Sequence, residues 1–122
     1  MIYLDYRDAR PIYVQIMDGI KEQIASGILL PEDKLPSVRE LASSLTINPN
    51  TIQRAYRQLE MEGWIVTVPG KGCFVCSDQR AALQEQKRQL AAFDEMVQSL
   101  LAFGISRDAL IARIQKGGNE HA

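Results

Sequence analysis

Residues 35–75 read LPSVRELASSLTINPNTIQRAYRQLEMEGWIVTVPGKGCFV, and this stretch decides the fold. Ser37 followed three residues later by Glu40 predicts a capping box, in which each side chain bonds the backbone amide of the other residue. The box predicts a short helix from Val38 to about Leu45, with its apolar residues on one face. We therefore expect this helix to pack against a core.

A second helix is predicted after a tight turn at Thr46 and Ile47. Asn48 followed by Pro49 is typical of a helix start, because the Asn side chain caps the first turn and Pro has no amide hydrogen to leave unpaired. Gly63 is the expected end of this helix. Its predicted buried face consists of Ile52, Ala55, Tyr56 and Leu59. Two short helices joined by a tight turn indicate a helix-turn-helix.

The flanking segments complete a winged domain. Residues 64–68 are β-branched and aromatic, residues 73–76 are apolar, and the PGKG between them is turn-forming, which predicts a β-hairpin. Upstream, Pro11 and Gly27 bracket a predicted helix with a stripe of regularly spaced isoleucines. Three helices followed by a hairpin form a winged helix-turn-helix domain, which we assign to residues 1–76.

Residues 77–122 predict two further helices, with Gly104 between them and Ser106 at the start of the second. This segment is too short for a separate ligand-binding domain. Its narrow apolar stripe must pack on the winged domain, on a second copy of the chain, or on both. We predict a helical dimerisation tail with contacts from Leu90, Phe93, Val97, Leu100, Leu110 and Ile114. The predicted fold class is mainly α with a small β-hairpin: a winged helix-turn-helix followed by two C-terminal helices.

Length and composition exclude several classes of protein. A chain of 122 residues is too short for an enzyme with separate cofactor and substrate domains. It has no run of about 18 apolar residues and no apolar segment at its start, so we expect no membrane helix and no signal peptide, and predict a cytoplasmic protein. No Ser-His-Asp set, phosphate loop or carboxylate pair with a histidine can be assembled, so we expect neither catalysis nor a cofactor.

The cysteines Cys73 and Cys76 suggest a metal or redox site only at first sight. On a strand, residues three apart point to opposite faces, which is poor geometry for a bond between them. Even with His121, the single histidine, they are too few for the roughly four ligands of a zinc site. We therefore expect no metal and structural roles for both cysteines.

The charge is distributed unevenly along the chain. The net charge of -1 argues at first against a nucleic-acid-binding protein, whose footprint is usually basic. However, residues 1–33 carry a net charge of -3, residues 34–71 a net charge of +2, and residues 72–122 a net charge of 0. The basic segment coincides with the helix-turn-helix and the hairpin, and its small excess predicts modest, salt-dependent non-specific affinity for DNA.

Polar side chains that can read DNA lie opposite the buried face of the second helix of the helix-turn-helix. They are Asn50, Gln53, Arg54 and Arg57. In the major groove, Arg pairs with guanine, and Asn or Gln with adenine, through two hydrogen bonds each. We also expect free backbone amides at Asn50 and Thr51 to meet a phosphate. Together these groups predict a recognition helix.

Two further elements are candidates for DNA contacts. Arg39 projects from the preceding helix, which normally crosses the DNA backbone. Gly70 and Lys71 combine little side-chain bulk with one cation at the hairpin tip, as insertion into a narrow minor groove requires. They predict a wing that contacts DNA.

Each feature also has an ordinary structural explanation. Any surface helix has a polar outer face, so Arg54 and Arg57 taken alone are more often solvated charges. PGKG alone is more often only a turn. Trp64 and Tyr56 are expected in the core, with a phosphate contact by the Tyr56 hydroxyl as an alternative. The DNA-binding interpretation depends on all these features occurring in the order that a winged helix requires.

The sequence resembles the N-terminal DNA-binding region of GntR-family bacterial transcription regulators, in the version found in the YtrA-like subfamily. The resemblance covers residues 8–76 closely, including the lead-in RPIYVQI, and the tail more loosely. It implies an operator-binding winged domain and a short tail that forms the homodimer. It also implies DNA contacts from Arg39, Asn48, Asn50, Thr51, Arg54, Gly70 and Lys71. Cys73 departs from the small hydroxyl residue that usually follows the turn.

We therefore predict a sequence-specific transcription regulator, a repressor that binds a palindromic operator as a homodimer. The alternative is a winged-helix module that binds another protein and no DNA, which the near-neutral charge favours. A cleft between tail helices is a further candidate site for a small-molecule effector, although no set of residues identifies one.

Overall fold

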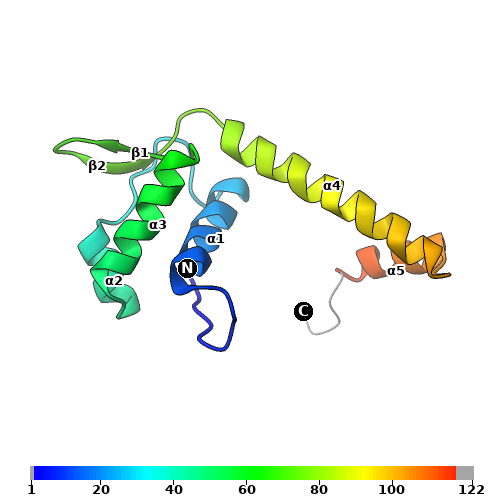
Figure 1. Ribbon diagram of the computed structural model, residues 1–122. Coiled ribbons are helices and arrows are strands. Elements are labelled where there is room, and N and C mark those ends of the chain that lie inside the picture. Colours follow the sequence, from blue (N-terminus) through cyan, green and yellow to red (C-terminus); the bar gives the residue numbers. More distant parts are fainter. Residues whose placement is uncertain (1, 118–122) are drawn as a thin grey trace. The chain divides into compact units, whose positions relative to one another are not determined.

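The computed structural model describes residues 2–117, which form five helices and one two-stranded antiparallel sheet (Figure 1). The chain forms two compact units, Met1–Gln84 and Glu85–Ala122. The first contains α1 (Ile12–Ala25), α2 (Val38–Leu45), α3 (Pro49–Met61), β1 (Ile65–Val68) and β2 (Gly72–Val75). The predicted fold class, mainly α with a β-hairpin, is confirmed.

The core of the first unit lies between α1, α2, α3 and the hairpin. Ile16 of α1 and Ile52 and Leu59 of α3 are completely buried, and Trp64 is buried just before β1. Ala82, in the first turn of α4 (Arg80–Ala102), belongs to the same core, so this unit extends beyond residue 76. The predicted division after residue 76 stays a prediction.

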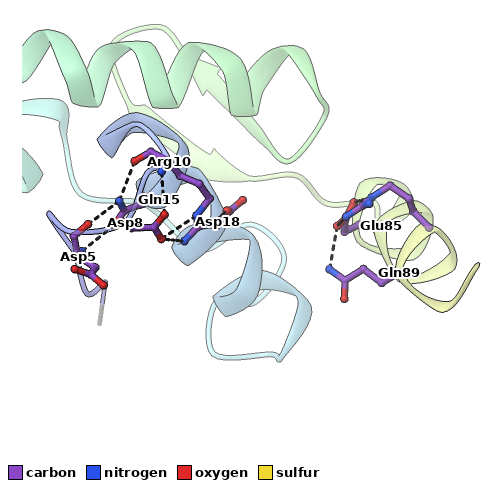
Figure 2. Close-up of polar contacts among 8 residues, drawn as sticks. Asp5, Asp8, Arg10, Gln15, Asp18, Glu85 and Gln89 are labelled. Carbon is purple, nitrogen blue, oxygen red and sulfur yellow. Dashed lines mark hydrogen bonds and ion pairs between the residues drawn. The ribbon is translucent and has the colours of Figure 1, made fainter. Parts of the chain in front are cut away.

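The N-terminal segment is bound to α1 through Gln15, a buried polar residue (Figure 2). The Asp5 amide donates to Gln15 Oε1 over 2.8 Å, and Gln15 Nε2 donates to the carbonyl oxygens of Asp5 and Arg10 over 2.9 and 3.1 Å. Ile2 lies against Gly19, where an added Cβ would stand 3.2 Å from the Ile2 side chain. These contacts hold an irregular segment on a helix face that would otherwise be open to water.

The predicted capping box starts α2. The Ser37 hydroxyl accepts from the Glu40 amide over 3.0 Å, and the Glu40 carboxylate accepts from the Ser37 amide over 2.8 Å. The hydrogen bond from the Ser37 amide lowers the pKa of the Glu40 carboxyl. The turn to α3 then passes through Thr46, whose φ and ψ of 57° and 50° are left-handed, and Ile47, whose amide donates to the Ala42 carbonyl over 2.9 Å. Local hydrogen bonds thus define this helix and turn.

Residues of the loop between α1 and α2 form backbone hydrogen bonds with β2, on the side of that strand opposite β1. Lys34 forms a bridge with Phe74, and the Leu35 amide donates to the Cys73 carbonyl over 2.9 Å. The amide of Val75 donates to the Asp33 carbonyl over 2.8 Å. β2 ends at Val75, one residue earlier than the segment 73–76 predicted. This pairing holds the hairpin against the chain that leads into α2.

The second half of the chain is helical. α4 (Arg80–Ala102) is followed by α5 (Arg107–Gln115), whose cap is Ser106, as predicted: its hydroxyl accepts from the Ala109 amide over 3.1 Å. Within residues 2–117, no helix combines the length and apolar character needed to cross a membrane.

The left-handed backbone of Thr46 generates a stability prediction. A β-branched residue rarely adopts this conformation, which costs roughly 1–2 kcal/mol for an L-residue, whereas Asn tolerates it. We expect Thr46→Asn to raise the free energy of unfolding by about 0.5–1 kcal/mol, measured by urea denaturation. Ser43→Asn, at an exposed position inside α2, is the matched control and should not stabilise. Equal effects of both changes would contradict the strain at Thr46.

Candidate nucleic-acid interface

The candidate interface begins with the outer face of α3. Burial of its inner face turns the opposite side chains to solvent, and the four predicted reader residues are all exposed: Asn50, Gln53, Arg54 and Arg57. Their spacings of three and four residues place them on one side of the helix. The predicted exposure is confirmed, whereas their contacts with DNA stay a prediction.

The first turn of α3 differs from the expectation of free backbone amides. The Asn50 amide donates to Asn48 Oδ1 over 2.8 Å, and the Thr51 amide donates to the Asn48 carbonyl over 3.0 Å. Pro49 has no amide hydrogen. The expectation that these amides are free was wrong, because Asn48 accepts from both. DNA contacts at this turn stay a prediction.

Arg54 stacks on an aromatic ring of another helix. Its guanidinium carbon lies 3.9 Å from the centroid of the Tyr13 ring on α1. This distance is within the range of a cation–π interaction. Arg54 is thus an exposed charge whose guanidinium lies over a ring, and its contact with DNA stays a prediction. The sequence places Tyr13 on the first predicted helix, two helices before Arg54, and gives no sign of this contact.

The Tyr56 hydroxyl does not face solvent. It donates to the Pro36 carbonyl over 2.7 Å, and the side chain is 3 % exposed. Burial raises the pKa of this hydroxyl above its ordinary value. The alternative of a phosphate contact by Tyr56 was wrong, and the expected core position is confirmed. Trp64 is also buried, with the Lys21 ammonium 5.5 Å from the centroid of its ring.

The hairpin tip presents Lys71 on a tight turn. The Lys71 amide donates to the Val68 carbonyl over 2.9 Å, Pro69 is the second residue of the turn, and Gly70, the third, has a φ of 76°. This is the pattern of a type II turn, which requires a positive φ at its third residue. A Cβ on Gly70 would meet no atom within 4 Å, so the backbone conformation and not space favours glycine. Lys71 is exposed at this tip.

Lys34 also lies beside the wing, although it was not among the predicted DNA-contacting residues. An added Cβ on Gly72 would stand 3.0 Å from Lys34 Cε, so the lysine stem crosses the backbone next to the turn. The only sign of Lys34 in the sequence was its place among the basic residues of the positively charged segment 34–71. Only the pairing of Lys34 with Phe74 brings it to the hairpin.

The five basic side chains of residues 34–71 are all exposed, and none lies within 4.0 Å of an acidic group of the described residues. They are Lys34, Arg39, Arg54, Arg57 and Lys71. In contrast, Arg10 pairs with Asp8 and Asp18, and Lys21 pairs with Glu62 over 2.9 Å. The positive charge of this segment is therefore available to an outside anion.

Glu60 connects α3 to the wing. Its carboxylate accepts from the Thr67 amide over 3.0 Å and from the Thr67 hydroxyl over 3.2 Å. The Thr67 oxygen also lies 3.4 Å from the sulfur of Cys73 across the hairpin. The recognition helix and both hairpin strands thus share one polar network.

The structure describes both cysteines as free thiols. Cys73 and Cys76 are half-buried, and burial raises the pKa of Cys76. Their expected structural role is consistent with these positions. His121 lies outside the described residues.

The second unit exposes the apolar residues predicted for dimerisation. Leu90, Phe93 and Ile114 are 63 %, 48 % and 57 % exposed. The other three are half-buried: Val97, Leu100 and Leu110. The sequence analysis missed four more exposed apolar residues: Met96, Phe103, Ile105 and Ile111. Whether these residues form a dimer interface stays a prediction.

Comparisons with known proteins find similar sequences and similar structures. The sequence pattern of "Bacterial regulatory proteins, gntR family" matches residues 12–75. The HTH-type transcriptional repressor YtrA of Bacillus subtilis is 47% identical over 87 residues, which cover 71% of this chain and 67% of that protein. A GntR family transcriptional regulator from Listeria monocytogenes has a similar structure, with a TM-score of 0.77, 38% identity, and coverage of 93% of this chain and 98% of that one.

A solved structure of the AraR DNA-binding domain in complex with an operator is also similar. Its TM-score is 0.54 and its identity 31%, over 61% of this chain and 89% of that one. The similar domain of AraR was therefore solved while bound to operator DNA. This likeness favours the DNA-binding interpretation over the alternative of a protein-interaction module.

The Glu60 contacts predict local behaviour of the wing. We expect Glu60→Ala to speed hydrogen exchange of the Thr67 amide roughly 3- to 10-fold, because that amide loses its acceptor. Glu60→Gln keeps an acceptor oxygen and should have a smaller effect. The Val75 amide, which donates to the Asp33 carbonyl, is the internal reference and should be unchanged. Unchanged exchange at Thr67 in the alanine variant would show that Glu60 does not hold the wing.

Proposed function

This chain belongs to the GntR family of bacterial regulatory proteins and is a DNA-binding transcription regulator, and we propose that it is a repressor that binds a palindromic operator as a homodimer. The repressor role is supported by its similarity to the YtrA repressor. The proposed place of action is the cytoplasm, where a bacterial chromosome lies.

One observation carries the proposed mode of binding: α2, α3, the wing and the loop before α2 carry five exposed cations, none of which lies within 4.0 Å of an acidic group among residues 2–117. DNA presents a dense row of phosphates, and lysine and arginine that neutralise them release counterions. Cations already paired with carboxylates contribute less, because the carboxylate competes with the phosphate. The placement of the unpaired cations therefore favours DNA approaching this side of the first unit.

The proposed roles follow from the position of each side chain. Arg54, Arg57, Asn50 and Gln53 read base edges in the major groove from α3. Asn48 and Thr51, at the start of α3, contact the edge of the groove or the backbone. Arg39 binds a phosphate from α2, and Gly70 with Lys71 enters the adjacent minor groove. The residues are the ones named in the sequence prediction, whereas Thr51 now acts through its side chain.

The homodimer is proposed from the exposed apolar residues of α4 and α5. Large exposed apolar patches on a protein surface mark interaction sites. Leu90, Phe93 and Val97 follow each other at spacings of three and four along α4, so they share one face. A symmetric dimer would bury the same face of both copies. Its two recognition helices would then meet half-sites about one DNA turn apart, or a small multiple of it.

The binding proposal is tested by titration of a duplex that the wild-type protein selects from a random-sequence pool. We expect Arg54→Ala to raise the dissociation constant roughly 5- to 150-fold, because one bidentate base contact is worth about 1–3 kcal/mol. Arg80→Ala removes the same charge from an exposed position outside the interface and is the control. An Arg54→Ala variant that keeps full sequence-specific affinity would contradict the assigned face.

The dimer proposal is tested by sedimentation at micromolar concentration. The wild type should sediment with twice the mass of the chain, and Phe93→Glu should shift it to the monomer, because a buried unpaired charge disfavours association. Gln98→Glu introduces the same charge at an exposed polar position of α4 and should leave the dimer intact. A wild-type monomer would overturn the homodimer and the palindromic operator together.

A further inference from the structure

We propose that Tyr13 is a positioning residue for DNA recognition: its ring holds the Arg54 guanidinium in the orientation in which it reads a base. This inference rests on the proposed function, because it assigns the source of specificity within that site. Tyr13 itself lies on α1 and need not touch DNA.

The first argument is the geometry of the stack. The Arg54 guanidinium carbon is 3.9 Å from the Tyr13 ring centroid, which places the cation over the ring. A guanidinium stacked on a ring uses its flat face, so the N–H groups along its edge stay free to donate. Those edge donors are the groups that pair with guanine O6 and N7. The contact with Tyr13 therefore orients Arg54 without using its donors.

The second argument is that Tyr13 is held firmly. It is half-buried and packs against the core cluster between α1 and α3. Both helices contribute completely buried side chains to that core, among them Ile16 and Ile52. A ring fixed in this way restricts the arginine stem, which otherwise loses much rotamer freedom when it binds. Preorganisation of this kind increases affinity by reducing the entropy lost on binding.

The third argument is the contrast with Arg57. Both arginines are exposed on the outer face of α3, and neither has an acidic partner within 4.0 Å among residues 2–117. Within that same range, the cation–π contacts are Arg54 on Tyr13 and Lys21 on Trp64. Tyr13 therefore acts on one of the two arginines, which makes Arg57 an internal control.

The test compares variants of the full chain on the selected duplex and on a scrambled duplex of the same composition. We expect Tyr13→Leu to weaken binding to the selected duplex about 3- to 10-fold and to leave binding to the scrambled duplex unchanged, because only base reading depends on the orientation of Arg54. Tyr13→Phe keeps the aromatic ring and should bind like the wild type. A Phe variant as weak as the Leu variant would overturn the proposal.

A double-mutant cycle separates positioning from a general structural effect. In the Arg54→Ala background, Tyr13→Leu should cause no further loss, whereas in the Arg57→Ala background it should cause its full loss. Equal losses in both backgrounds would overturn the proposal. Loss of sequence-specific binding by Arg54→Ala but not by Tyr13→Leu would overturn this inference alone, and a wild type that prefers no duplex would overturn the proposed function itself.

A measurement on the wild type keeps the inference falsifiable if the Leu variant does not fold. In the NMR spectrum of the DNA-free protein, the side-chain N–H signal of Arg54 should be shifted upfield by the Tyr13 ring, and that of Arg57 should not. An Arg54 signal at the position of an unstacked arginine would overturn the proposal.

Discussion

The packing of α3 against α1 is the constraint on which the rest of this structure depends. Once Ile52 and Leu59 are buried against Ile16 and its neighbours, the rotation of α3 about its axis is determined. That rotation decides which side chains face solvent, so the proposed recognition face follows from the core. It also brings Tyr13 of α1 to Arg54 of α3. A repacked core would therefore change binding without touching a residue of the interface.

The other elements of the first unit are attached to α3 by short polar connections. Glu60 binds the wing through Thr67, and the Tyr56 hydroxyl binds the Pro36 carbonyl just before α2. Pairing of Lys34 with Phe74 adds the connecting loop to the hairpin. These bonds link elements whose positions the apolar core alone leaves adjustable. The wing and the start of α2 are therefore held to α3 by hydrogen bonds as well as by the core.

Charge pairing explains how a protein with a net charge of -1 presents a basic surface. Arg10 and Lys21, outside the helix-turn-helix and wing, have carboxylate partners. Of the three acidic side chains inside residues 34–71, Glu40 and Glu60 accept hydrogen bonds from backbone amides, and Glu62 pairs with Lys21. Among residues 2–117, the cations of this segment therefore have no acidic group within 4.0 Å. The local availability of charge, and not the total, is what DNA meets.

The sequence by itself determined the order and bounds of the helices, the hairpin and the exposed face of α3, because caps, turns and apolar periodicity act over a few residues. Only the tertiary structure decided the partners of individual polar groups. The Tyr56 hydroxyl and the Arg54 guanidinium have partners that the sequence did not indicate. Both partners are distant in the chain, and rotamers and distances across a packed core are not encoded in any local pattern.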